Sequence, residues 1–450
     1  MAASDEIAAP PPSGDPALGR RRFRQCLSYA RKVFDLDALL GGIHDTRSRQ
    51  HIATALVMRI LFFVGLLRLR SFNALDPMLA EPWMQRALGV VVEEGKKACS
   101  VDTLGYVLDR VKLETARHTV IQVNKQAERN KVFREGWYGA KRFVAIDGWE
   151  LYSSYHRCCS GCLTRKVRVG NEVVTQYYHR YVVALYVDQQ LDVVLDIEQV
   201  RSADVRKDLE EVGPNEVAGH EGELTAAKRL VSRLHETYGR WLDILLLDAL
   251  YANGPFFTLA KECGYGVIVT LKKSHNEPFK EALSVWGEQR AERVVRNDKG
   301  EQVELWDCPE LRTLSTYDGP IRVVRGVVHN DSWKKPKTWC FGVTGKAAGL
   351  SSARVLDAGR ARWHIENTAF YQFVEYWPFA HVFHHGAVAL PALLWIFCLA
   401  FNLLQIFTYR QLLGYGRARG KDVTRTFLRL VDEMRGDLAR LDELIAWDTS

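Results

Sequence analysis

The chain is poor in cysteine, with 9 in 450 residues. It also lacks an apolar N-terminal segment of the kind that directs secretion. These two absences argue against a secreted scaffold held together by disulfides, and we expect the protein in a reducing compartment, the cytoplasm. The cysteines are then free thiols or metal ligands.

Neither sign of charge is in large excess. Lys and Arg number 61 against 54 Asp and Glu, a formal net charge of +7. This mild basic excess is compatible with a polyanionic partner such as DNA, although it does not establish one. The hydrophobic content of 47% is enough for a large core, and a chain of this length predicts two or three domains.

Long hydrophobic runs are scarce, and the longest, residues 386–407, contains polar side chains. Pro391, Asn402 and Gln405 would be costly in lipid, so the run favours a buried core helix over a membrane span. Residues 48–70 are also apolar but are interrupted by Arg59, which favours a buried helix of a bundle. We therefore expect no membrane partner.

The N-terminal part has two compositions. Residues 1–19 are small, polar and Pro-rich, which predicts a disordered tail. Residues 20–138 show helical spacing of apolar side chains, for example at Phe23 and Leu27, and predict an all-helical DNA-binding domain. Its first helix opens with a basic cluster that is typical either of a phosphate contact or of a solvated face, the arginines at 20, 21, 22 and 24.

From residue 142 the pattern changes to strands. Two runs separated by the turn Gln189-Gln190 follow a first apolar run, and together they predict antiparallel strands: FVAIDGWEL, YYHRYVVALYVD and LDVVLDIEQV. A helix over 222–239, a strand, a helix over 255–262 and a further strand come next, the two strands being DILLLDAL and YGVIVTL. This order predicts a mixed α/β sheet.

Three carboxylates stand out in this region. Asp147 and Asp248 lie near the ends of short apolar runs, where a charge is unusual for packing reasons alone. Residues 361–372 read as one helix in which Arg362 and Glu366, four positions apart, share a face. A surface ion pair and three unrelated acids are the alternatives, but the strand and helix context favours a metal site.

The same residues carry a resemblance to a known family. Asp147 on the first strand and Asp248 after the fourth are placed as in the ribonuclease H-like fold. The sequence resembles DDE transposases of bacterial insertion sequences, in the group with a Tyr-Arg-Glu-Lys signature, where Arg precedes Glu by four positions as Arg362 precedes Glu366. The stretches RWHIEN and YWPFAHVFHH also look like this group's C-terminal pattern.

The chain departs from that signature at two positions. Gly359 stands where the group has Tyr, and Phe373 stands where it has Lys. The phosphate contacts that these two side chains make in the group therefore do not carry over to this chain. Arg360 and Tyr371 are the neighbours that could replace them.

The resemblance implies a fold of several parts. It is a ribonuclease H-like mixed sheet with an inserted β subdomain, preceded by the helical domain. Residues 139–273 and 347–408 form the catalytic core, the second part with the Glu366 helix, and residues 409–450 form a C-terminal helical segment that is a candidate for dimerisation. Residues 274–346 are the insert, which carries Trp333 and Trp339 for core packing or base stacking and basic residues that could follow a DNA backbone: Arg322, Arg325, Lys334, Lys335 and Lys337.

The resemblance also implies an activity. The protein would bind double-stranded DNA, the element ends and the target, as a homodimer in the synaptic complex, and would cleave DNA and transfer strands with two Mg²⁺ or Mn²⁺ ions. Asp147 would bridge both ions, Asp248 and Glu366 would each complete one coordination sphere, and Arg362 would hold a phosphate oxygen. The alternatives are a ribonuclease H-like nuclease without strand transfer and a catalytically inactive descendant that binds DNA.

A second group of candidate ligands lies in the loop HRCCSGCLTR. Cys158 or Cys159 is spaced from Cys162 as in zinc-binding loops, with His156 before them and His179 after. The second half of a four-ligand site is not clearly paired in the sequence, and free thiols are the alternative. A structural Zn²⁺ site is the hypothesis for these residues.

Overall fold

The computed structural model describes residues 22–133, 141–188, 191–211, 219–272, 276–297, 300–412 and 432. Several of the predictions above fall outside these ranges: the tail at 1–19, Arg20 and Arg21, the turn Gln189-Gln190 and nearly all of the segment at 409–450. The described chain is a mixed α/β protein built on one 10-stranded sheet.

In residues 22–133 the regular elements are all helices, joined by loops, and one isolated bridge links Asp45 to Val111. The spacing of Phe23, Leu27 and Phe34 buries one side of the first helix. Ser100 caps a later helix by accepting a hydrogen bond from the amide of Thr103. The elements are α2 (Arg22–Phe34), α3 (Leu36–Gly41), α4 (Thr54–Leu66), α5 (Phe72–Leu75), η1 (Pro77–Ala80), α6 (Pro82–Leu88), α7 (Val101–Leu108) and α8 (Leu113–Arg129).

The sheet contains the five strands that the sequence analysis names, four strands in the stretch predicted as an inserted β subdomain, and β2, which was not predicted. Its order is β2-β3-β1-β5-β6-β10-β9-β8-β7, with β4 paired to β3. The strands are β1 (Phe143–Ser154), β2 (Leu163–Val169), β3 (Glu172–Val187), β4 (Asp192–Gln199), β5 (Ile244–Leu247), β6 (Gly266–Thr270), β7 (Arg293–Arg296), β8 (Gln302–Leu311), β9 (Ile321–His329) and β10 (Lys337–Thr344).

Strand directions divide the sheet into three parts. The first three long strands, β1, β3 and β4, pair antiparallel, whereas β5 lies parallel to β1 and β6 parallel to β5. The remaining strands, β7 to β10, lie in the stretch predicted as an inserted β subdomain. They continue the same sheet, because β10 pairs antiparallel with β6 through Phe341 and Thr270.

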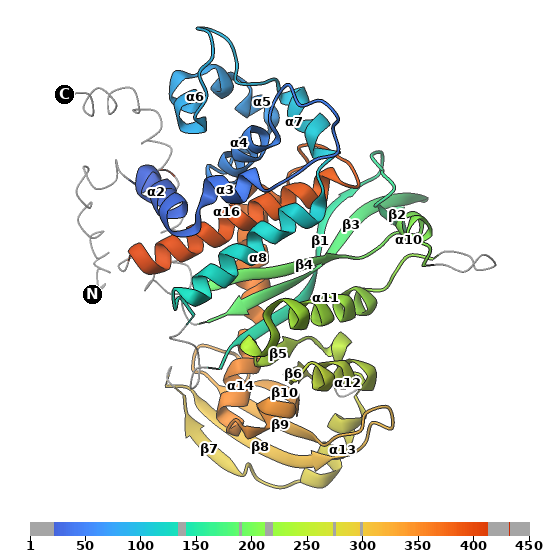
Figure 1. The fold of residues 1–450 in the computed structure, drawn as a ribbon. Coiled ribbons are helices and arrows are strands. Elements are labelled where there is room, and N and C mark those ends of the chain that lie inside the picture. The colour runs from blue at the N-terminus through green and yellow to red at the C-terminus, as the bar shows by residue number, and fades with distance from the viewer. Residues whose placement is uncertain are drawn as a thin grey trace, which may run out of the picture.

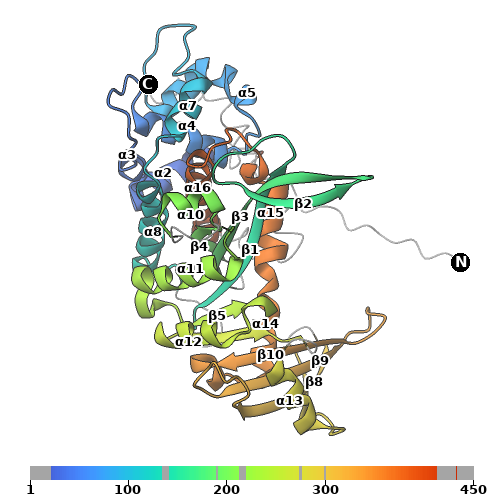
Figure 2. The same ribbon diagram turned by 90° about the vertical axis from the view of Figure 1, so that its right-hand side faces the viewer.

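Helices cover both faces of the sheet. In Figure 2, α11 (Glu223–Tyr238) and α12 (Gly254–Glu262) lie on one side of the strands, and α14 (Ser352–Ala361) and α15 (Tyr371–Glu375) lie on the other. Figure 1 shows the N-terminal helices at one end of the molecule and β7 to β10 at the other. The other elements are α10 (Ala203–Asp208), η2 (Gly239–Trp241), η3 (Ala249–Tyr251), α13 (Glu277–Trp286), η4 (Gly345–Gly349), η5 (Ile365–Phe370), η6 (Pro378–Ala380) and α16 (Ala389–Gln411).

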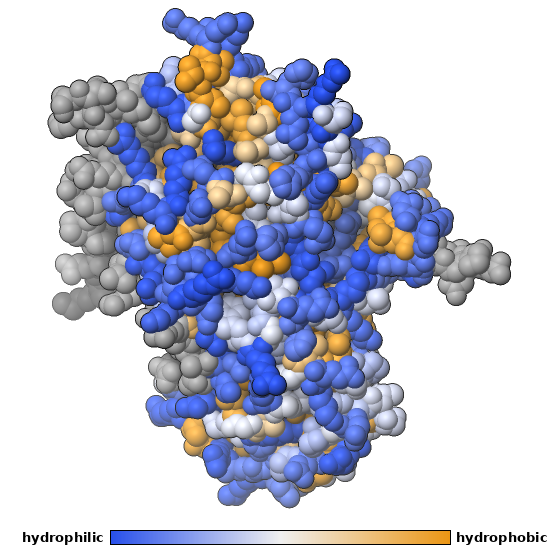
Figure 3. All heavy atoms as spheres, viewed as in Figure 1, coloured by the Kyte–Doolittle hydropathy of each residue, from blue (hydrophilic) through white to orange (hydrophobic). Residues whose placement is uncertain are grey.

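Helix α16 is the core helix that the sequence favours. It is long and apolar enough to cross a membrane, but its apolar window is entirely buried inside the protein. It packs against α4, where a Cβ on Gly65 would lie 2.9 Å from the Phe397 ring. The N-terminal helices and the sheet thus share one hydrophobic core. On the face shown in Figure 3, the surface is mostly hydrophilic with separate apolar patches.

Asn402 explains how α16 tolerates a polar residue in this core. Its side chain is fully buried, and its Oδ1 accepts a hydrogen bond from the Val194 amide at 2.9 Å. Its Nδ2 donates to the Val194 carbonyl at 2.7 Å and to Asn124 Oδ1 at 3.1 Å. The amide therefore joins α16 to β4 and α8 with its polar atoms paired.

We expect Asn402→Leu to lower the free energy of unfolding by about 2–3 kcal/mol, because the buried Val194 amide and carbonyl lose a partner. Urea denaturation measures the change. Gln122→Leu, which also replaces a side-chain amide with leucine but at an exposed position of α8, is the control and should change stability by less than about 0.5 kcal/mol. Equal stability of the two variants would contradict the role of Asn402 as a buried hydrogen-bonding partner of Val194.

Candidate functional site

The two predicted aspartates lie on neighbouring strands. Ile146 of β1 pairs in parallel with Leu247 of β5, so the residues that follow, Asp147 and Asp248, lie at adjacent positions. Asp248 directly follows β5 and caps η3 by accepting a hydrogen bond from the Ala249 amide. Parallel pairing at this point brings together two residues that are 101 positions apart in the sequence.

The segment predicted as one helix over 361–372 is helical but not a regular α-helix. Helix α14 ends at Ala361, a π-helical turn forms η5, and α15 follows. Arg362 and Glu366 share a face, as predicted, and they form the ion pair that was named as the alternative, with Arg362 Nη1 2.7 Å from Glu366 Oε1. The widened turn therefore contains Glu366, and π turns of this kind are frequent at functional sites.

Arg362 also connects this segment to β1. Its Nη1 donates to Asp147 Oδ2 at 2.8 Å, so one guanidinium nitrogen contacts two carboxylates. The Arg362 side chain is 5% exposed, that of Asp147 is 16% exposed and that of Glu366 is 37% exposed. The site is thus open on the Glu366 side and closed around Arg362.

One positive charge does not balance the carboxylates here. Burial is the largest cause that raises the pKa of Asp147 to about 7; Arg362 opposes the rise, and the Glu366 carboxylate adds to it. A carboxyl with such a pKa releases its proton readily when a second cation arrives. The charge distribution therefore suits a divalent cation between these side chains.

A fourth acid, Glu223, lies beside the site and was not predicted. Its Oε1 accepts a hydrogen bond from the buried Tyr251 hydroxyl at 2.7 Å, and its Oε2 lies 3.3 Å from Arg180 Nε. A Cβ on Gly148 would be 2.1 Å from Glu223 Oε2, so the carboxylate lies against the residue that follows Asp147. Burial and Glu223, then Asp147 and Asp248, raise the pKa of the Tyr251 hydroxyl, which keeps it protonated among these acids.

The two departures from the Tyr-Arg-Glu-Lys signature have packing explanations. Gly359 is buried on α14, and a Cβ there would be 2.5 Å from the Phe341 ring of β10. Phe373 is buried and its ring stacks on Phe379 with centroids 4.3 Å apart. Each position therefore belongs to the core.

Arg360 and Tyr371, named above as replacements for the missing Tyr and Lys, differ in their surroundings. Arg360 Nη1 lies 3.5 Å from Glu301 Oε2, and the guanidinium lies over the Trp339 ring at 4.7 Å, so Arg360 is engaged within the protein. Tyr371 is 48% exposed on α15, next to the turn that carries Glu366. Tyr371 is therefore better placed than Arg360 to contact a bound phosphate.

We expect Gly359→Ala to lower the free energy of unfolding by about 1–3 kcal/mol, because the added methyl group overpacks α14 against Phe341. Thermal or urea denaturation measures the effect. Gly349→Ala, at a position where an added Cβ would meet no atom within 4 Å, is the matched control and should be nearly neutral. A stable Gly359→Ala protein would contradict the close contact of α14 with β10.

The basic residues predicted to follow DNA do not share one environment. Arg322 is paired with Asp307 and donates to the carbonyls of Ala348 and Leu350, which makes it a structural residue. Lys334 and Lys335 are exposed in the turn between β9 and β10. The other side chains pack on aromatic rings: Arg325 over Trp306, Lys337 over Trp333, and Trp333 against Trp339.

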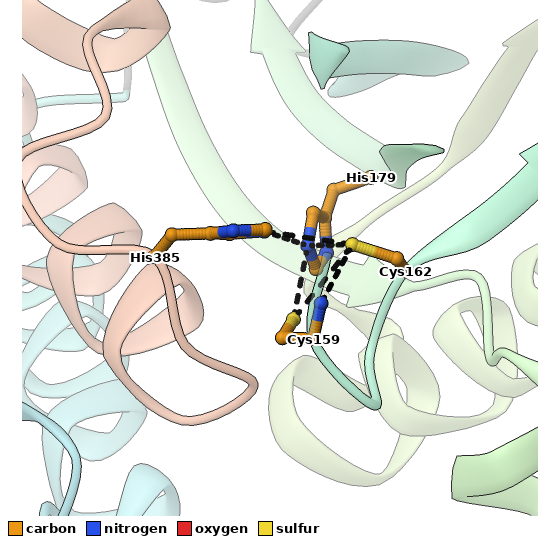
Figure 4. A group of neighbouring side chains, drawn as sticks. All are labelled: Cys159, Cys162, His179 and His385. Atoms are coloured by element: carbon orange, nitrogen blue, oxygen red, sulfur yellow. Dashed lines mark hydrogen bonds between the residues drawn. The ribbon is translucent and has the colours of Figure 1, made fainter. Parts of the chain in front are cut away.

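The predicted zinc ligands come together in part. Cys159, Cys162 and His179 converge, and His385 completes the group, whereas Cys158 is exposed and lies outside it (Figure 4). The contact with the Cys162 thiol, supported by His179, lowers the pKa of Cys159 to about 4. The sequence signal for His385 was the histidine pair at 384 and 385, but nothing in the sequence joined it to a loop so far away.

Within the described ranges, these four side chains are the one set of three or more potential ligands whose atoms all lie within 4.8 Å of one another. Asp147, Asp248 and Glu366 do not form such a set: Arg362 lies between Asp147 and Glu366, and Asp248 is next to Asp147 through the pairing of β1 with β5. No protein-family model matches the chain, and no curated protein matches its sequence.

Proposed function

We propose that this protein is a cytoplasmic DDE transposase that binds the ends of its insertion sequence and catalyses DNA cleavage and strand transfer. The observation that carries the proposal is the meeting of three carboxylate-bearing elements. Asp147 and Asp248 lie at adjacent positions of β1 and β5, and Arg362 brings Glu366 to Asp147. Carboxylates are oxygen ligands of the kind that hold the divalent metals of phosphodiester chemistry.

The sheet order supports a ribonuclease H-like core. Strands β4, β3 and β1 are antiparallel, and β5 and β6 continue the sheet in parallel with β1, with α11 and α12 between the later strands. The proposal assigns residues 20–138 to a DNA-binding domain and residues 274–346 to an inserted β subdomain. On this assignment the carboxylates lie on the core between those two parts.

The side chains fit a divalent cation. Two carboxylates converge on a single guanidinium nitrogen, and the raised pKa of Asp147 reflects burial and unbalanced negative charge. Asp147, Asp248 and Glu366 would hold Mg²⁺ or Mn²⁺, which prefer such oxygen ligands. When bound, the ions supply charge stabilisation for the attacking and leaving oxygens of a phosphodiester.

The remaining residues of the site would bind and orient DNA. The proposal assigns Arg362 to hold a phosphate oxygen once cations take over the two carboxylates that its guanidinium contacts here. Trp363 and Tyr371, which flank Glu366 along the helical segment, are 47% and 48% exposed. Exposed aromatic rings beside the carboxylates suit stacking on bases that leave the duplex.

A labelled duplex carrying the element end tests the proposal. In Mg²⁺ we expect nicking at the element boundary and joining of the new 3′ end to a target plasmid, with neither product in EDTA. Binding of two chains to two ends would agree with the proposed homodimer. Cleavage without joining would favour a nuclease of ribonuclease H type, and binding without cleavage would favour the inactive DNA-binding descendant.

A further inference from the structure

We infer that Cys159, Cys162, His179 and His385 bind one zinc ion, and that this ion fastens the segment between the Glu366 helix and α16 to the sheet. The inference is independent of the proposed DNA chemistry. The four ligands come from three separate segments: the loop between β1 and β2 gives both cysteines, β3 gives His179, and residues 381–388 give His385. Figure 4 shows the four side chains directed at one point.

The distances among the ligand atoms match a zinc tetrahedron. With Zn–S near 2.3 Å and Zn–N near 2.0–2.1 Å, the edges are about 3.8 Å between sulfurs, about 3.5 Å between sulfur and nitrogen and about 3.3 Å between nitrogens. The two sulfurs are 3.8 Å apart, and the Nε2 atoms of His179 and His385 are 3.3 Å apart. Cys162 Sγ lies 3.2 Å from His179 Nε2 and 3.5 Å from His385 Nε2, and Cys159 Sγ lies 3.4 Å from His179 Nε2.

Hydrogen bonding alone does not account for this convergence. His179 Nε2 lies within 3.5 Å of both sulfurs and of His385 Nε2, but a ring nitrogen carries either one proton or one lone pair. It can therefore make one good hydrogen bond, not three. An ion at the centre gives each of the four atoms one bond.

The loop is shaped to present its two sulfurs. The Cys162 amide donates to the Cys159 carbonyl at 3.0 Å, and the Cys159 amide donates to Cys162 Sγ at 3.3 Å. Gly161 lies between them, and a Cβ there would be 3.2 Å from the His179 ring. The small residue lets the turn approach the imidazole closely.

The ligand set points to a structural role. His179 is fully buried and Cys162 is buried, and four protein ligands leave no position for a substrate. The segment that carries His385 also contacts the N-terminal helices, because His384 Nε2 lies 2.8 Å from Asp109 Oδ2 just after α7. The ion would thus hold one segment against β3 while its neighbour contacts the end of α7.

Metal analysis of the full-length protein, purified without chelator in reducing buffer, tests the inference. We expect one zinc per chain, and Co²⁺ in its place should give the visible bands of tetrahedral cobalt with thiolate ligands. His385→Ala and Cys162→Ser should weaken zinc binding by more than about 100-fold. The controls, His381→Ala in the same segment and Cys158→Ser in the same loop, should bind zinc as the wild type does.

Hydrogen exchange tests the fastening role separately. Removing zinc with a chelator should speed amide exchange in residues 381–388, and adding zinc should restore protection. Three results would overturn the zinc site. The wild type could fail to bind zinc or Co²⁺, Cys159 and Cys162 could form a disulfide in reducing buffer, or the control variants could lose zinc binding as much as the ligand variants do. If the ligand variants do not fold, the cobalt spectrum of the wild type tests the site: tetrahedral bands with thiolate ligands support it, and their absence overturns it. Unchanged exchange on zinc removal would overturn the fastening role.

Discussion

Glu366→Gln is expected to lower the rate of cleavage of a labelled element end by at least about 10³-fold, or about 4 kcal/mol in the barrier. The change keeps the size of the side chain but removes the negative charge that a divalent cation requires. Glu366 is 37% exposed, so its replacement should not unfold the protein. Single-turnover cleavage in Mg²⁺, measured with binding of the same duplex, separates chemistry from affinity.

Glu375→Gln is the matched control. Glu375 is exposed at the end of α15, nine positions after Glu366, and should tolerate the same replacement without loss of cleavage or binding. If Glu366→Gln cleaves as fast as this control, Glu366 is not a metal ligand. The assignment of the π-helical turn as catalytic would then be wrong.

Arg362→Met is expected to lower the free energy of unfolding by about 3–5 kcal/mol in EDTA. Met keeps an unbranched apolar stem but removes the cation that contacts Asp147 and Glu366, which leaves two carboxylates facing each other. Mg²⁺ should restore part of this loss if the carboxylates hold a cation. Urea denaturation of the variant and the wild type, with and without Mg²⁺, measures both effects.

Arg362→Lys is the control for charge. It retains a cation near Asp147, so we expect a smaller loss of stability and a smaller response to Mg²⁺. A loss in Arg362→Met that Mg²⁺ does not change would mean that the carboxylates bind no cation. Arg362 would then be a structural ion-pair partner.

Sequence patterns predicted the elements that are buried or periodic. Alternating and continuous apolar runs identified β1, β3, β4, β5 and β6, and the stretch predicted as an inserted β subdomain contains β7 to β10. Strand β2 was missed because its residues are mostly exposed and charged, so it has no apolar pattern. The pairing of β10 with β6 was also not visible, because register between distant strands is a tertiary property.

In the candidate site, too, the sequence identified residues in local patterns but not contacts between distant residues. Asp147, Asp248, Arg362 and Glu366 could be named because each lies in a local pattern. His385 could not, since it is 206 positions from His179 and meets it only after the sheet forms. Glu223 is the first residue of an ordinary amphipathic helix, and only its contact with Tyr251 distinguishes it.

Anomalous diffraction from crystals grown with Mn²⁺ tests the central claim most directly, because it locates the cation. The account predicts an anomalous peak within bonding distance of the carboxylates of Asp147 and Asp248, with Glu366 as a further ligand, and Arg362 displaced from at least one carboxylate. Glu366→Gln should weaken the peak. Absence of a peak in crystals of protein that cleaves DNA in Mn²⁺ would contradict the claim that these carboxylates form the catalytic site.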